Sequence, residues 1–173
     1  KKLVSVYVSC GYNKGRAGHE LKDVATVFIL GTLFGWTPCS QDWWTQRSVN
    51  FFNPSLGLRK CQLPRSRHAG PEIMAQLNTT HIKIVHYAKT SYDGVSYEDV
   101  LRIKHNVEAA VDEVLRTINQ DPSSNENKHN QNVVLLFLDK STRIHMHQIF
   151  NWYHKGILKA PVFTLVRRAL QVR

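Results

Sequence analysis

The sequence predicts an α/β domain of the three-layer, Rossmann-like kind, in which a mainly parallel sheet is flanked by helices. Short apolar runs alternate with segments of helical periodicity along most of the chain. The run at 133–138 is apolar at every position, as is typical of a strand buried on both faces of a parallel sheet. With 173 residues, 42% of them hydrophobic, the chain can bury one core. We therefore expect a single domain over residues 1–173.

The first forty residues predict a strand, a glycine-rich loop and a helix. Residues 3–9 form a short apolar run that meets a turn at Gly11. Apolar residues recur at helical spacing over about 17–33, and Gly35 stands where a helix stop is expected. A second short strand is predicted over 36–39. This order is the opening of a βαβ unit.

Residues 40–72 form a long aromatic and basic segment without periodicity, which we expect to be a loop. Trp43 and Trp44 lie within it, and hydrophobic side chains of this size favour partial order. Asp42 is the only acid between Ser40 and Gly70. Its basic residues are Arg47, Arg59, Lys60, Arg65 and Arg67. The segment therefore presents positive charge.

The second half predicts a strand, a long helix and a central strand. Residues 81–87 alternate as in a half-buried strand. Ser96 with Asp99 gives a capping-box-like signal. It precedes apolar residues at helical spacing, namely Val100, Ile103, Val107, Ala110, Val114 and Ile118. The polar stretch 119–132 predicts a flexible loop before the strand at 133–138.

The last third is predicted to be helical and is strongly basic. A helix from Thr142 to about Lys155 is expected to end at Gly156, and Pro161 opens another. From Lys140 onward there are seven basic residues and no acid. The predicted helix would gather polar side chains within roughly an 80° sector. These are Arg143, His147, Asn151 and His154.

The cysteines leave the cellular compartment open. The chain has three cysteines, Cys10, Cys39 and Cys61, and no two of them form a C-x-x-C pair. Three cysteines are equally compatible with one disulfide plus one free thiol and with three free thiols. Residues 78–80 (Asn-Thr-Thr) are a glycosylation acceptor only in a secreted chain. No apolar run approaches 18 residues, so no transmembrane segment is expected. The domain is expected to be soluble, either cytoplasmic or the lumenal part of a secretory-pathway enzyme.

The loop after the first strand is the leading candidate for a phosphate or donor site. Glycines at 11, 15 and 18 allow close backbone approach, and the following helix N-terminus stabilises an anion. Beside Gly11, Gly15 and Gly18, the loop has side chains that can donate hydrogen bonds to a phosphate, namely Lys14, Arg16 and His19. The pattern is neither G-x-G-x-x-G nor a P-loop. The alternative is a tight βα turn with solvated charges.

A second candidate follows the apolar strand, at 139–143, and continues to His145 and His147. An Asp followed by Ser and Thr is also an ordinary helix cap, and a polar stripe is usually a solvated face. On a helix, His145 and His147 would not face each other, so a metal pair is disfavoured there. They would point the same way only on a strand. We predict no metal site.

Three further features can take part in binding or catalysis. Trp43 and Trp44 can stack on sugars or bases, or can anchor their loop to the core. His86, Asp93 and Glu98 lie near a strand tip, where a general base is found in this architecture. No G-x-S-x-G elbow is present.

Residues 15–21 (GRAGHEL) resemble the glycine-rich first loop, of the type G-x-x-G-N-Q/R, of fucosyltransferase-like glycosyltransferases with the GT-B fold. His19 stands where Asn is commoner. Residues 139–148 with Asn151 and Trp152 are similar to a second block of the same N-terminal half. The resemblance covers about the first 35 residues. It implies two facing Rossmann-like domains, of which the second holds most of the nucleotide sugar and is not among these 173 residues.

The leading hypothesis is thus a glycosyltransferase, or its N-terminal half, that transfers a sugar such as fucose from a GDP- or UDP-sugar to a glycan or protein hydroxyl. It would use no metal or other cofactor, and it would work with a C-terminal nucleotide-binding domain. Arg143 and His147, with Trp43 and Trp44, are the acceptor-binding candidates, and Asp93 or His86 the catalytic base. A basic nucleic-acid-binding module, suggested by the pI of about 9.7, and a non-catalytic interaction domain are the alternatives.

Overall fold

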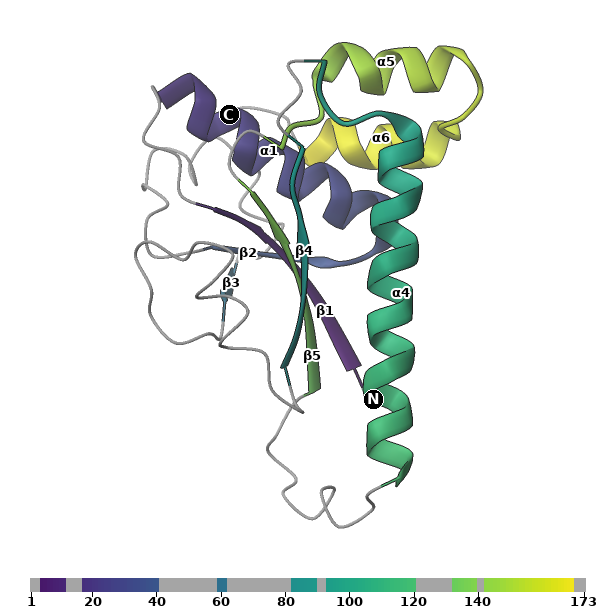
Figure 1. The fold of residues 1–173 in the computed structure, drawn as a ribbon. Helices are drawn as coiled ribbons and strands as arrows, with labels where there is room; N and C mark the ends of the chain where they lie inside the picture. The colour runs from purple at the N-terminus through teal and green to yellow at the C-terminus, as the bar shows by residue number, and fades with distance from the viewer. Residues whose placement is uncertain are drawn as a thin grey trace.

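The computed structural model describes residues 4–11, 17–40, 59–61, 82–89, 93–120, 132–139 and 142–169 (Figure 1). The strands are β1 (Val4–Cys10), β2 (Thr37–Ser40), β3 (Arg59–Lys60), β4 (Ile82–Tyr87) and β5 (Asn132–Leu138). The helices are α1 (Ala17–Phe34), α4 (Tyr97–Gln120), α5 (Met146–His154) and α6 (Ala160–Ala169). Strands and helices alternate for most of this length, which confirms the predicted α/β class.

The strands form one parallel sheet in the order β3-β2-β1-β5-β4. β5 lies between β1 and β4, as its uniformly apolar sequence predicts. Its pairing with β1 runs from Val4 opposite Asn132 to Cys10 opposite Leu138. The predicted Rossmann-like domain, with a parallel sheet flanked by helices, is confirmed.

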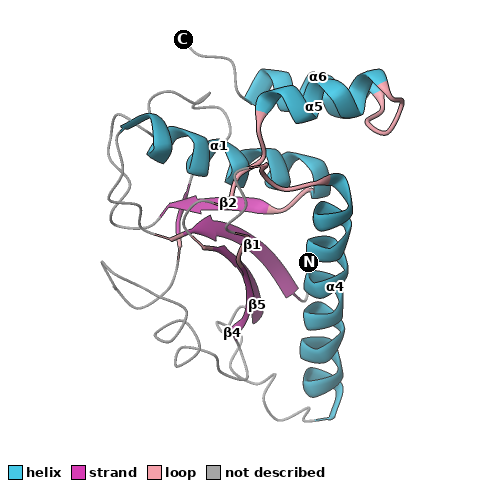
Figure 2. Ribbon diagram, turned by 45° about the horizontal axis from the view of Figure 1, so that its top comes forward, coloured by secondary structure: helices cyan, strands magenta, loops and turns pink. Residues whose placement is uncertain are grey.

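The described helices share the larger hydrophobic cluster, which lies on one face of the sheet. The steps from β1 to β2 and from β4 to β5 cross the sheet in the same direction, so right-handed connections place α1 and α4 on the same face. Accordingly Phe28 of α1, Ile103 of α4 and Leu136 of β5 belong to one buried cluster. Figures 1 and 2 show these helices beside the sheet, with α5 and α6 at one end.

The opposite face carries a smaller cluster and the disulfide. Tyr7, Leu135 and Phe137 are buried there with Cys39. A disulfide joins Cys39 to Cys61, 22 residues apart, while Cys10 is a buried thiol outside it. Of the cysteine alternatives, one disulfide plus one thiol is therefore found. The expectation of a loop throughout 40–72 is wrong at 59–60, where β3 pairs with β2.

The helix ends follow the sequence signals closely, with one correction. Gly35, after α1, has a φ of 67°, and Gly156, after α5, has a φ of 71°. α4 continues to Gln120, so the polar loop predicted from residue 119 begins later, and residues 121–131 lie outside the described residues. None of the described helices is long and apolar enough to cross a membrane.

Candidate functional site at the carboxyl edge of the sheet

The carboxyl ends of β1 and β5 meet at Gly11. This residue is buried, and its backbone N–H donates to the carbonyl oxygen of Leu138 at 2.7 Å. α1 then begins at Ala17, and its first turn exposes Gly18 and His19. Among the described residues, no atom outside the helix's own first turn lies within 4 Å of the position that a Cβ on Gly18 would take. The candidates Gly11, Gly18 and His19 thus belong to the junction of β1 and α1.

The remaining phosphate candidates, Lys14, Gly15 and Arg16, lie outside the described residues, as do the acceptor candidates Trp43 and Trp44. Their assignment therefore stays a prediction from the sequence.

The ends of β4 and β5 are joined by backbone hydrogen bonds and one buried threonine. The backbone N–H of Asp139 donates to the Tyr87 carbonyl at 2.9 Å, and that of Thr142 donates to the Asp139 carbonyl at 3.1 Å. The Thr142 hydroxyl accepts the backbone N–H of Lys89 at 3.0 Å. The chain leaving β5 is therefore held against the chain leaving β4.

Arg143 crosses from this segment to α1. Its Nε lies 2.5 Å from Oδ1 of Asp23, and its Nη2 lies 3.4 Å from Oδ2. The Asp23 side chain is 2% exposed and that of Arg143 is 14% exposed, so the pair is largely withdrawn from water. One residue on, the Ile144 N–H donates to the buried Thr26 hydroxyl at 2.9 Å. Arg143 therefore ties the β5 exit to α1, and binding of an acceptor by it remains a prediction.

The helix predicted from Thr142 begins at Met146 instead. The Arg143 carbonyl accepts the Val95 N–H and the Ile144 N–H donates to Thr26, so tertiary hydrogen bonds hold this segment. His145 is extended, with φ −83° and ψ 145°. Consequently Arg143 does not share a helix face with His147. The rings of His145 and His147 stack, with centroids 5.5 Å apart and an 11° angle, so the expectation that they do not face each other is wrong. Among the described residues, no group of three or more metal-ligating side chains is present.

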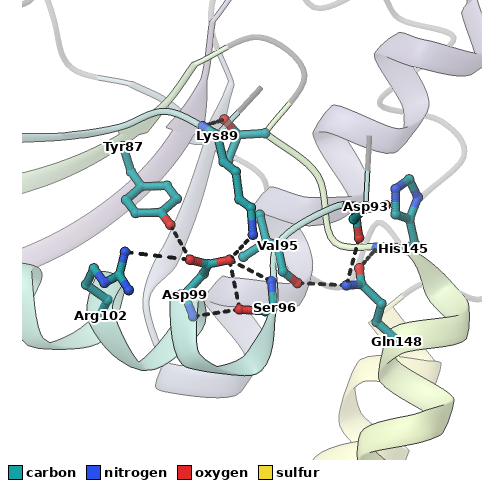
Figure 3. A network of polar contacts seen from close by, with 10 residues as sticks. Tyr87, Lys89, Asp93, Val95, Ser96, Asp99, Arg102, His145 and Gln148 are labelled. Carbon is teal, nitrogen blue, oxygen red and sulfur yellow. Dashed lines mark hydrogen bonds and ion pairs between the residues drawn. The ribbon is translucent and has the colours of Figure 1, made fainter. Parts of the chain in front are cut away.

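A buried carboxylate, Asp99, organises the exit of β4 (Figure 3). It accepts the Tyr87 hydroxyl at 3.0 Å and forms a close ion pair with Lys89. The Ser96 backbone N–H and hydroxyl donate to it at 2.9 and 2.8 Å, and its own N–H donates back to the Ser96 hydroxyl at 3.2 Å. The capping box predicted at the start of α4 is confirmed. A more exposed guanidinium, that of Arg102, lies 3.8 Å away.

The hydrogen bonds of this cluster set its protonation. Burial raises the pKa of Asp99, but the hydrogen bonds from Lys89, Ser96 and Tyr87 outweigh it and hold this pKa well below its usual range. Burial and the neighbouring Asp99 carboxylate raise the pKa of Tyr87 to about 12. At neutral pH the cluster therefore contains a carboxylate and a neutral phenol, which is a stable anchor rather than a proton-transfer pair.

The turn at 93–95 packs closely against the start of α5. Gln148 donates through Nε2 to the carbonyls of Val95 at 3.0 Å and Asp93 at 3.3 Å, and it accepts the His145 N–H at 2.8 Å. Val95 donates its N–H to the carbonyl of Arg143 at 2.7 Å. These bonds position Asp93, an exposed candidate base, beside the first turn of α5 (Figure 3).

The two candidate bases lie on different sides of the sheet. His86 is exposed, and its ring stacks on Phe137, with centroids 6.0 Å apart, on the face opposite the helices. Asp93 lies in the turn that contacts α5 on the helical side. His86 and Asp93 are therefore separate candidates, and neither forms a described cluster with the other.

Three residues of this edge are missed by reasoning from the sequence: Asp23, Tyr87 and Lys89. Asp23 lies in the first half of α1, directly before its apolar stretch, and this position is the signal that could have indicated a buried partner. Tyr87 and Lys89 read as the end of an ordinary strand. Only the packing of β4 against the start of α4 brings them to Asp99.

Comparison of the chain with protein-family models, with curated proteins and with solved structures gives no match.

Proposed function

We propose that this domain is the N-terminal half of a nucleotide-sugar-dependent glycosyltransferase and binds the donor diphosphate where β1 meets α1. The placement of this junction carries the proposal. β1 is an interior strand of a parallel sheet, and the helix after it opens with Gly18 and His19 exposed. Open α/β sheets bind ligands at the carboxyl ends of their strands, and helix N-termini stabilise anions.

In the proposed reaction, an acceptor hydroxyl oxygen bonds to the anomeric carbon of the donor sugar. The bond from that carbon to the diphosphate oxygen breaks, and the nucleoside diphosphate leaves with the electron pair. Lys14, Arg16 and His19 would stabilise the charge that develops on the diphosphate. Asp93 or His86 would take the hydroxyl proton.

The acceptor would be held on the same edge of the sheet. Trp43 and Trp44 would provide stacking surfaces for a sugar ring. His147 is exposed in the first turn of α5, while Arg143 can offer only those donors that Asp23 leaves available. We therefore assign His147 the more direct acceptor contact of the two.

Thermal unfolding with GDP, UDP, ADP and CDP tests the proposal. A ligand at about 100 times its Kd adds roughly 2.7 kcal/mol to the free energy of unfolding. We expect one nucleotide to raise the Tm selectively, and Arg16→Ala to abolish the rise. Lys22→Ala is the control, because Lys22 is an exposed cation on α1 beyond its first turn.

The same thermal unfolding experiment distinguishes donor binding from the alternative function, nucleic-acid binding. Stabilisation by a short single-stranded oligonucleotide alone, lost as salt is added, would replace the proposal with nucleic-acid binding. An unchanged Tm with all four nucleotides, at concentrations to 10 mM, would overturn donor binding by this domain.

A further inference from the structure

The α5 and α6 helices carry a partly exposed aromatic patch that the proposed function does not use. Met146 and Phe150 lie one turn apart on α5 and are 43% and 46% exposed. Phe163 of α6 packs edge-on against Phe150, with ring centroids 5.5 Å apart, and stacks on Tyr153 at 4.2 Å. We call these four residues the aromatic patch. Figures 1 and 2 show α5 and α6 side by side at one end of the domain.

Positive charges border the patch. Lys159, Phe163 and Arg167 are spaced by four residues, which places them on one face of the helix. The hydrogen bond from the Phe163 N–H to the Lys159 carbonyl, at 3.0 Å, confirms this register. Lys159, Arg167 and Arg168 are all exposed, and the sequence from residue 140 to its end contains no acid. The charged side chains that α5 and α6 themselves supply are therefore all positive.

The packing of the rings distinguishes between two kinds of anionic partner. Bases of a nucleic acid bind by stacking on ring faces, but here Tyr153 and Phe163 stack on each other with an interplanar angle of 20°. Met146 and Phe150 also expose apolar side chain, at 43% and 46%. A lipid bilayer accepts both features, since apolar side chains enter its interface and cations attract anionic headgroups.

We propose that the α5–α6 pair docks on an anionic membrane surface, with the aromatic patch at the boundary of headgroups and acyl chains and with Lys159, Arg167 and Arg168 on acidic headgroups. This inference is independent of the proposed catalytic function. It concerns a surface formed by α5 and α6, whereas the donor site is assigned to the junction of β1 and α1.

Cosedimentation of the full chain with lipid vesicles tests the docking. We expect binding to vesicles of phosphatidylcholine with about 30% phosphatidylserine, and much weaker binding to phosphatidylcholine alone. Met146→Ser with Phe150→Ser should weaken partitioning of the chain into these vesicles at least about tenfold, because it removes the two most exposed apolar side chains of the aromatic patch. Arg167→Gln with Arg168→Gln should weaken it about fivefold per charge.

Matched control variants on α4 test whether vesicle binding depends on the aromatic patch itself or only on the number of exposed apolar and basic side chains. Leu101→Ser removes an apolar side chain of the same 46% exposure as Phe150. Lys104→Gln with Arg116→Gln removes the same number of cations from the solvent-facing side of α4. Both control variants should bind vesicles like the unaltered chain, and circular dichroism verifies that every variant is folded.

Two results would overturn the docking proposal. One is equal binding of the unaltered chain and the folded Met146→Ser/Phe150→Ser variant, or no binding of either. The other is binding of an oligonucleotide that Arg167→Gln/Arg168→Gln abolishes and Met146→Ser/Phe150→Ser does not change, because that pattern assigns the surface to nucleic acid. Neither result bears on donor binding, which the nucleotide titration measures separately.

Discussion

Arg143 and Asp23 lie 120 residues apart in the chain, yet the Arg143 Nε lies 2.5 Å from an Asp23 carboxylate oxygen that is almost fully buried. This pair connects the segment that leaves β5 to the first half of α1. It therefore holds the chain that leaves β5 against α1.

Removing one member of this pair should be more costly than removing both. Asp23→Leu leaves a buried guanidinium without its carboxylate, and we expect a loss of about 3 kcal/mol in the free energy of unfolding. In the double variant Asp23→Leu/Arg143→Met, the loss in the free energy of unfolding should be clearly smaller than the sum of the losses in the two single variants. Urea unfolding of the four proteins of this double-mutant cycle measures the coupling. Additive losses would show that the pair contributes no interaction.

The carboxylate of Asp99 should make stability depend on pH in the acid range. Its pKa in the folded chain lies below the usual value of about 3.9. Its stabilising effect is therefore complete above that value and declines as the pH falls toward the folded pKa. We expect the stability difference between the unaltered chain and Asp99→Asn to be constant from pH 7 to 5 and to shrink below about pH 4.

Urea unfolding at each pH measures this difference, with Asp112→Asn as the control on an exposed position of the same helix. A difference for Asp99→Asn that stays constant down to pH 2.5 would contradict the assignment.

Gly94 is expected to tolerate no side chain. Its φ is 75°, and a Cβ there would lie 2.5 Å from Cδ2 of His145 and 3.0 Å from the Arg143 carbonyl oxygen. Gly35 has a similar φ of 67° but no atom within 4 Å of its Cβ position. Gly35→Ala should therefore cost only the backbone strain, about 1 kcal/mol. Gly94→Ala should lower the stability in thermal unfolding clearly more than Gly35→Ala does. Equal losses in the two variants would show that His145, Gln148 and Arg143 can move aside to accommodate the methyl group.

The disulfide is expected to hold β3 on the sheet. β3 has only two residues, and the backbone N–H of Cys61, directly after it, donates to the Ser40 carbonyl at 3.0 Å. The disulfide between Cys39 and Cys61 closes a loop of 22 residues, and closing a loop of this length stabilises the folded chain by about 3 kcal/mol. Dithiothreitol should lower the stability of the unaltered chain and leave that of Cys39→Ala/Cys61→Ala unchanged. A similar response in both proteins would assign the effect to something other than this bond.

The predictions from sequence succeeded where a local pattern determines the structure. The spacing of apolar residues defines α1 and α4, glycines mark the ends of α1 and α5, and the Ser96–Asp99 capping box starts α4. The uniformly apolar run of β5 indicates its place inside the sheet. They failed at residues 142–145, where tertiary hydrogen bonds to Thr26 and Val95 replace the first helical turn.

By itself, the sequence determined the α/β class, the order of the main elements and the capping box of α4, because these depend on side-chain periodicity and on backbone conformations close along the chain. Only the tertiary structure decided which polar residues meet. Asp23 with Arg143, Asp99 with Tyr87 and Lys89, and Cys39 with Cys61 are joined across 10 to 120 residues. The physical reason is that burial makes an unpaired charge or hydrogen-bonding group costly, and which groups become buried together depends on strand order and helix packing rather than on neighbouring sequence.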